Sequence, residues 1–146
     1  MKKLFFVLTV SVALFQLSSC AKKEGCTDLS AKNYNSEAEE DDGSCTYEAS
    51  ITLWMSQTTA ENFQADGIYS LTYKLDGQVV GTSGTDVFFN SAPSCGANGA
   101  VTITKNLGSQ KTGVFSASVT DNNGDIFWEG TANLQANTCY IQEVSY

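Results

Sequence analysis

Apolar and polar residues alternate with a period of two through most of the chain after residue 48, which is the pattern of half-buried β-strands. In the first such run, Ile51, Leu53 and Met55 fall on one face. Further strands are predicted over residues 69–75, 78–81, 86–90, 100–105, 114–120, 125–134 and 138–146. Seven to eight short strands without a long helix favour an all-β fold, an antiparallel β-sandwich over residues 48–146. A small barrel is the alternative.

The same alternation predicts which side chains face the core. Asp76-Gly77 separates two runs and is typical of a two-residue hairpin turn. Residues 60–65 are compatible with one helical turn. The predicted inward positions of the later strands are Tyr69, Leu71, Tyr73, Leu75, Val101, Ile103, Phe115, Ala117, Val119, Ile126, Trp128, Ala132 and Leu134.

The first twenty residues have a different pattern. Lys2 and Lys3 precede an apolar run over residues 4–15, which suits a signal peptide (1–19) and is shorter than the roughly 20 residues that span a bilayer. The stretch Leu17-Ser18-Ser19-Cys20 that follows resembles the lipobox of bacterial lipoproteins. This resemblance implies lipid on the Cys20 thiol, cleavage before Cys20, and a short tether (20–25) to a membrane of the cell envelope. The absence of an aspartate directly after Cys20 favours the outer membrane, facing the periplasm or the surface. An ordinary secretory signal with a nearby cysteine is the alternative.

The chain has five cysteines, an odd number that is awkward for an exported protein. Assigning Cys20 to lipid leaves four. Cys26 and Cys45 enclose one short segment, and Cys95 and Cys139 both lie in the β-rich part, so we expect the disulfides Cys26–Cys45 and Cys95–Cys139, formed in an oxidising compartment. Free buried thiols are the alternative, and the wide spacing without histidine disfavours zinc.

Residues 26–47 form an acidic segment with few large apolar side chains, which a disulfide would have to hold together. Its pattern resembles a short module of secreted and surface proteins of the Bacteroidota, although Ser36 stands where that module usually has proline and Glu39 and Glu40 replace small or apolar residues. The resemblance implies an extracytoplasmic location rather than an activity. The matching residues are Cys26-Thr27-Asp28, Ala31, Asn33-Tyr34-Asn35, Ala38 and Asp41-Asp42-Gly43-Ser44-Cys45.

Oxygen-bearing side chains in this segment are candidate calcium ligands, because calcium prefers carboxylate, amide and carbonyl oxygens. If Asn33 opened an EF-hand-like loop, the required glycine at the sixth position would be missing and Ser44 would replace the closing glutamate. A solvated spacer is the other interpretation. The candidate ligands are Asp28, Asn33, Asn35, Glu37, Asp41 and Asp42.

The amino-acid composition argues against several classes of function. The chain has no histidine and no arginine, and its formal net charge is −8, which argues against nucleic acid as a partner. Without an imidazole or a spare thiol, the usual hydrolytic triads are excluded, so we predict no catalytic residues. A hydrolase that uses two carboxylates in one cleft is the minor alternative.

Trp54 and Phe127 fall opposite the apolar faces of their strands, so they are candidate exposed side chains for a glycan or protein ligand. The 88–89 Phe-Phe pair is a third aromatic candidate. The alternative is that these rings are buried beneath a loop or the acidic module. The sequence therefore predicts a lipid-anchored, non-catalytic structural or interaction domain, with an anchored carbohydrate- or protein-binding module as the alternative.

Overall fold

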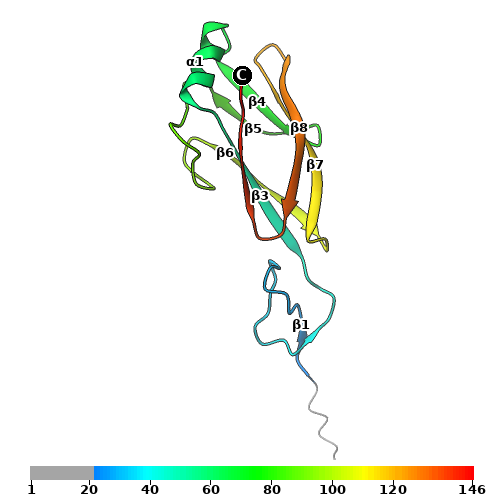
Figure 1. Ribbon diagram of the computed structural model, residues 1–146. Coiled ribbons are helices and arrows are strands. Elements are labelled where there is room, and N and C mark those ends of the chain that lie inside the picture. Colours follow the sequence, from blue (N-terminus) through cyan, green and yellow to red (C-terminus); the bar gives the residue numbers. More distant parts are fainter. Residues whose placement is uncertain (1–21) are drawn as a thin grey trace, which may run out of the picture.

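The computed structural model describes residues 22–146, so the predicted signal peptide and Cys20 lie outside the described residues. The chain forms a small looped module followed by a β domain (Figure 1). The module (22–46) has little regular structure apart from two short paired strands, β1 (Glu24–Gly25) and β2 (Glu40–Asp41). The predicted disulfide Cys26–Cys45 is confirmed and closes the module.

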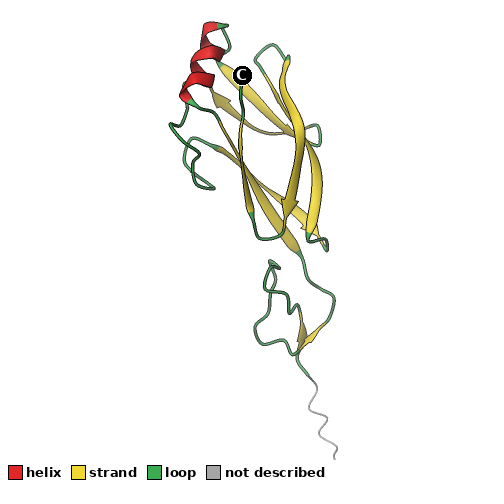
Figure 2. Ribbon diagram, viewed as in Figure 1, coloured by secondary structure: helices red, strands yellow, loops and turns green. Residues whose placement is uncertain are grey.

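The β domain is a sandwich of two sheets, which confirms the predicted all-β fold (Figure 2). A three-stranded sheet has the order β6 (Val101–Gly108), β3 (Tyr47–Trp54), β9 (Cys139–Glu143). A four-stranded sheet has the order β5 (Gln78–Gly84), β4 (Ser70–Leu75), β7 (Thr112–Thr120), β8 (Ile126–Gln135). One pair departs from the antiparallel prediction, because β9 runs parallel to β3. After β8 the chain turns at Asn137 and crosses to the other sheet instead of pairing with β8.

Period-two alternation places the core where the sequence predicts it. Ile51 and Leu53 from β3 face Leu71 and Tyr73 from β4, and all four are at most 3% exposed. The Asp76-Gly77 hairpin turn is confirmed, with both residues at positive φ. Tyr69 is a wrong prediction: it precedes β4 and is 67% exposed.

Strand β8 contains a β-bulge, so the prediction that Ile126 faces inward is wrong. Val119 pairs with Trp128, but the next residue of β7, Thr120, pairs with Ile126, so Phe127 is an extra residue. The extra residue lets both Phe127 and Trp128 pack against the core. It also reverses the side of Ile126, which is 61% exposed instead of buried.

One α-helix, α1 (Gln57–Ala65), covers one end of the sandwich and is longer than the single turn predicted (Figure 2). The Ser56 hydroxyl caps its start by accepting the N–H of Thr59, and the helix's own Phe63 is fully buried. No helix within residues 22–146 is long and apolar enough to cross a membrane.

The predicted strand at 86–90 is wrong: this stretch belongs to a loop (85–100) that crosses the outer face of the three-stranded sheet. Phe89 forms only an isolated bridge with Ser56, and its N–H donates to the Met55 carbonyl at 3.0 Å. The predicted disulfide Cys95–Cys139 is confirmed and fastens the loop to β9. Two consecutive phenylalanines do not alternate, so this stretch has no single apolar face to lay on a sheet.

Candidate functional site

The six candidate calcium ligands have local structural partners. Asn33 bridges the module, because its amide nitrogen donates to the Ser44 carbonyl and its amide oxygen accepts the N–H of Thr46, both at 2.8 Å. Asn35, Asp41 and Asp42 each accept the N–H of the residue two positions later, which forms Asx turns. These side chains therefore hold the shape of a segment that has almost no core.

The remaining two candidate ligands, Glu37 and Asp28, form ion pairs with Lys23 and Lys111. Within residues 22–146 no three acidic, histidine or cysteine side chains gather in a way that could hold a metal ion. Calcium binding by this set stays a prediction, and the side chains would have to move together to form a shared site.

Asp28 forms a joint between the module and the β domain. One carboxylate oxygen accepts the N–H and the hydroxyl of Ser30, at 2.9 and 2.7 Å. The other accepts the Tyr47 hydroxyl at 2.8 Å and pairs with Lys111, which precedes β7. Ala31, Cys26 and the buried residues of the β domain also belong to one hydrophobic cluster. The two parts are thus joined by packing and by an ion pair.

The joint alters the ionisation of its members. The Lys111 ammonium, followed by the N–H and hydroxyl of Ser30 and the hydroxyl of Tyr47, holds the pKa of Asp28 well below its usual range. The same carboxylate raises the pKa of Lys111 and of Tyr47. Asp28 is therefore ionised across the whole physiological range.

We expect Asp28→Asn to lower the stability of the folded protein at neutral pH. The asparagine can still accept the Ser30 N–H but loses the charge that attracts Lys111. Because the pKa of Asp28 is lower in the folded than in the unfolded protein, its ionised carboxylate stabilises the fold at pH values above the ordinary pKa near 3.8. This stabilisation is lost as the pH falls toward the pKa of the folded state. The gap in Tm between wild type and variant should therefore be constant from about pH 5 to 8 and shrink below pH 4.

Thermal unfolding followed by circular dichroism across that pH range measures this gap. Glu39→Gln is the matched control, because Glu39 is exposed and has no ion-pair partner among residues 22–146. A gap for Asp28→Asn that persists unchanged in strong acid would contradict the role of the carboxylate charge.

The interpretation of Trp54 and Phe127 as exposed side chains is wrong. Trp54 is 9% exposed, because the 85–100 loop covers it and Phe89 meets its ring edge-on at 6.5 Å. Phe127 sits in the β8 bulge, and its ring packs edge-on against Phe63 at 5.3 Å and beside Tyr146 at 6.0 Å. Burial under a loop, the alternative considered from the sequence, is confirmed for Trp54. Phe127 is half-buried, with Phe63 and Tyr146 packed against its ring.

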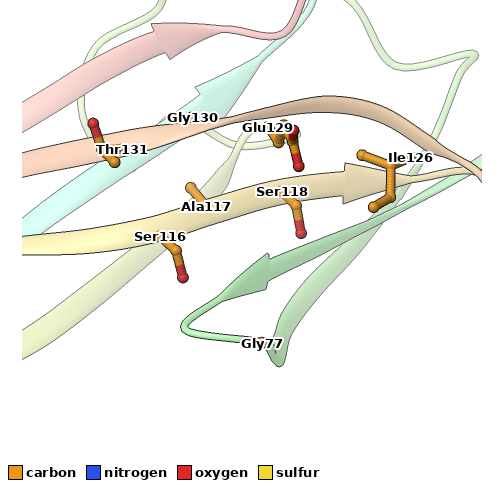
Figure 3. A pocket seen from close by; sticks show the side chains of 8 residues that line it. All are labelled: Gly77, Ser116, Ala117, Ser118, Ile126, Glu129, Gly130 and Thr131. Carbon is orange, nitrogen blue, oxygen red and sulfur yellow. The ribbon is translucent and has the colours of Figure 1, made fainter.

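A shallow groove lies on the outer face of the four-stranded sheet, with a volume of about 500 Å³ (Figure 3). Ser116 and Ser118 of β7 point to the same side of their strand, beside the turn at Gly77, and Glu129 of β8 lies next to Ser118 (Figure 3). We call this region the sheet groove, and the residues that define it are Gly77, Ser116, Ser118, Ile126, Glu129 and Thr131.

The polar groups of the sheet groove differ from those of the module in having no internal partner. Within residues 22–146, no hydrogen bond or ion pair engages the Glu129 carboxylate or the hydroxyls of Ser118 and Thr131. The sequence predicted only that these positions alternate with apolar ones. It did not reveal the groove, because adjacent strands build it. The groove contains one carboxylate and so lacks the acid pair that the hydrolase alternative requires.

Comparisons with known proteins add no identification. No protein-family model, curated protein or solved structure matched the chain.

Proposed function

We propose that this protein is a bacterial lipoprotein, anchored through lipid on Cys20, whose β domain has a non-catalytic structural or binding role at the cell envelope. One observation carries the proposal. The four cysteines of residues 22–146 pair with each other, Cys26 with Cys45 and Cys95 with Cys139. Of the five cysteines, the lipobox cysteine is the one that these two bonds do not use. Two disulfides also suit the oxidising environment outside the inner membrane.

The arrangement of the chain suits attachment at one end. The described residues begin at the end of the module that lies away from the β domain, and α1 and the C-terminus lie at the opposite end (Figure 1). A lipid upstream of Lys22 would therefore leave the β domain projecting from the membrane on the module. The excess of acidic residues would keep the folded part away from anionic headgroups, so lipid rather than surface charge would hold the protein. The outer membrane is the location we propose.

Intact mass spectrometry of the full-length gene product, extracted from bacterial membranes, tests the proposal. We expect the mass of residues 20–146 plus diacylglycerol and an acyl chain, less four hydrogens for two disulfides. The same sample digested with protease should give a lipid-modified peptide that starts at Cys20. A peptide that contains an unmodified Cys20 thiol, or Cys20 in a disulfide, would overturn the proposal.

A binding role is the more specific form of this function, and the sheet groove is the observation that favours it. Within the described residues, the Glu129 carboxylate and the hydroxyls of Ser118 and Thr131 form no hydrogen bond or ion pair, whereas polar side chains of the module hydrogen-bond to its backbone. A glycan or protein ligand for this domain would contact the groove or its border rather than Trp54 or Phe127.

A further inference from the structure

Strand β8 has one free edge. It pairs with β7 along its length and has no other strand partner among residues 22–146. With ten residues, it is the longest strand of the domain. Glu129, Thr131 and Asn133 are all exposed along this edge. An unpaired strand of this length presents a row of backbone groups that can pair with another chain.

The register shows which backbone groups of β8 are free. The Ser116 carbonyl accepts the N–H of Asp76 at 2.8 Å, so the polar backbone groups of Ser116 point toward β4. In an antiparallel ladder these groups alternate in direction, so those of Ala117 point toward β8, where Ala117 pairs with Gly130. The N–H and C=O groups of Glu129, Thr131 and Asn133 therefore point away from β7.

The other sheet edges are less suited to pairing. Strand β5 contains a register shift, and it approaches β6 so closely at Gly81 that an added Cβ would lie 2.6 Å from the Val101 side chain. Strand β9 has only five residues, and the edge strand β6 carries a lysine, Lys105. Natural proteins protect long edges with lysine, proline or bulges, but β8 has no lysine or proline, and its bulge lies at one end.

Charge indicates what kind of chain would pair there. Glu129 is the one charged residue of β8, and none of the ion pairs found in residues 22–146 includes it. Asp125 adds a second carboxylate immediately before β8. Side chains of an added strand would lie beside Glu129 and Thr131, at the border of the sheet groove, where a cation would meet an unpaired carboxylate.

We propose that the free edge of β8 binds an extended, lysine- or arginine-bearing segment of another protein as an added strand. This deepens the binding role proposed above by naming its site and the class of its partner. A second copy of this chain fits less well. Antiparallel pairing of two β8 strands would place the two modules at opposite ends, away from a shared membrane (Figure 1), and would bring together two chains of net charge −8.

The test uses the mature lipidated protein in a neutral detergent and a fluorescent nine-residue peptide in which threonine and lysine alternate. We expect binding in fluorescence anisotropy and slower hydrogen exchange of the amides in residues 129–133. Thr131→Pro removes one free N–H but no ladder bond, so it should weaken binding at least about tenfold. Thr131→Val is the matched comparison: it removes the same hydroxyl but keeps the N–H, so it should retain most of the binding that Thr131→Pro loses.

Two further peptides separate the contributions. A peptide with glutamate in place of lysine should bind more weakly, which tests the role of charge. A peptide with alternate backbone amides N-methylated should also bind more weakly, which tests strand pairing at the edge even if Thr131→Pro fails to fold. The proposal is overturned if the lysine peptide does not bind, if the N-methylated peptide binds equally well, or if native mass spectrometry finds a dimer that Thr131→Pro dissociates. Lipidation is measured independently by the intact mass, so failure of the edge does not imply failure of the anchor.

Discussion

Replacing Cys20 with alanine is expected to move the protein from the membrane to the soluble fraction. Each buried methylene of an acyl chain contributes about 0.8 kcal/mol to membrane binding, so two or three acyl chains anchor a protein durably. Without Cys20 the protein would carry no acyl chain and would lose this attachment. The folded part cannot compensate, because its excess of acidic residues repels anionic headgroups. The shift should therefore be close to complete in a form without the predicted signal peptide, which would otherwise act as a second anchor.

A mature-length form settles that point. Residues 20–146 exported behind an ordinary secretory signal, with alanine at position 20, should partition into the aqueous phase in detergent phase separation. The wild-type protein should partition into the detergent phase and incorporate labelled fatty acid. Ser19→Ala is the matched control, because alanine keeps a small residue before the cysteine and should preserve lipidation. Membrane retention of the secreted alanine form would contradict lipid anchoring through Cys20.

Local patterns in the sequence were sufficient to predict the β-sandwich and both disulfides. Period-two alternation identifies strands because each side chain of a half-buried strand meets either core or solvent. Cys26 and Cys45 pair within one short segment, so chain organisation alone pointed to that bond. The Asp76-Gly77 turn was likewise visible, because its two positive φ angles favour these residue types.

Features that depend on contacts between distant segments could not be predicted in the same way. The β8 bulge is defined by comparison with β7, so alternation within β8 alone misplaced Ile126. Trp54 lies on the outer face of its sheet, as the alternation indicated, and is buried because the 85–100 loop covers that face. The pairing of Asp28 with Lys111 depends on the turn between β6 and β7 meeting the module. Each of these features depends on a contact with a distant segment, so the sequence of a single strand does not predict it.

The disulfide Cys95–Cys139 is expected to contribute more to stability than any other single feature of the β domain. It joins residues 44 positions apart, and closing a loop of that length in the unfolded chain corresponds to about 4 kcal/mol. For a domain of this size, that loss would lower Tm by roughly 15–30 °C. The variant to measure is Cys95→Ser with Cys139→Ser, since changing one cysteine alone would leave a reactive thiol.

The position of the Cys95–Cys139 bond indicates that removing it would have an effect on the folded protein as well as on the entropy of the unfolded chain. Both sulfur atoms lie 3.5 Å from the Thr52 hydroxyl, which is fully buried in the middle of the three-stranded sheet. Without the bond, the 85–100 loop keeps the hydrogen bonds of Thr85 at its start and the packing of Phe89, but the part around residue 95 loses its attachment to β9. Water should therefore reach Thr52 and Trp54 more often. We therefore expect faster hydrogen exchange in β3 and a red-shifted tryptophan emission at temperatures well below the new Tm.

The second disulfide provides the matched comparison. Cys26→Ser with Cys45→Ser opens a loop between residues 19 positions apart in a module with little core, so it should unfold the module while β3 remains protected from exchange. If the two double variants lower the Tm of the β domain equally, the sandwich depends on the module more than the Asp28 joint implies. If Cys95→Ser with Cys139→Ser leaves Tm within a few degrees of wild type, packing of Phe89 on Trp54 would be sufficient to hold the loop.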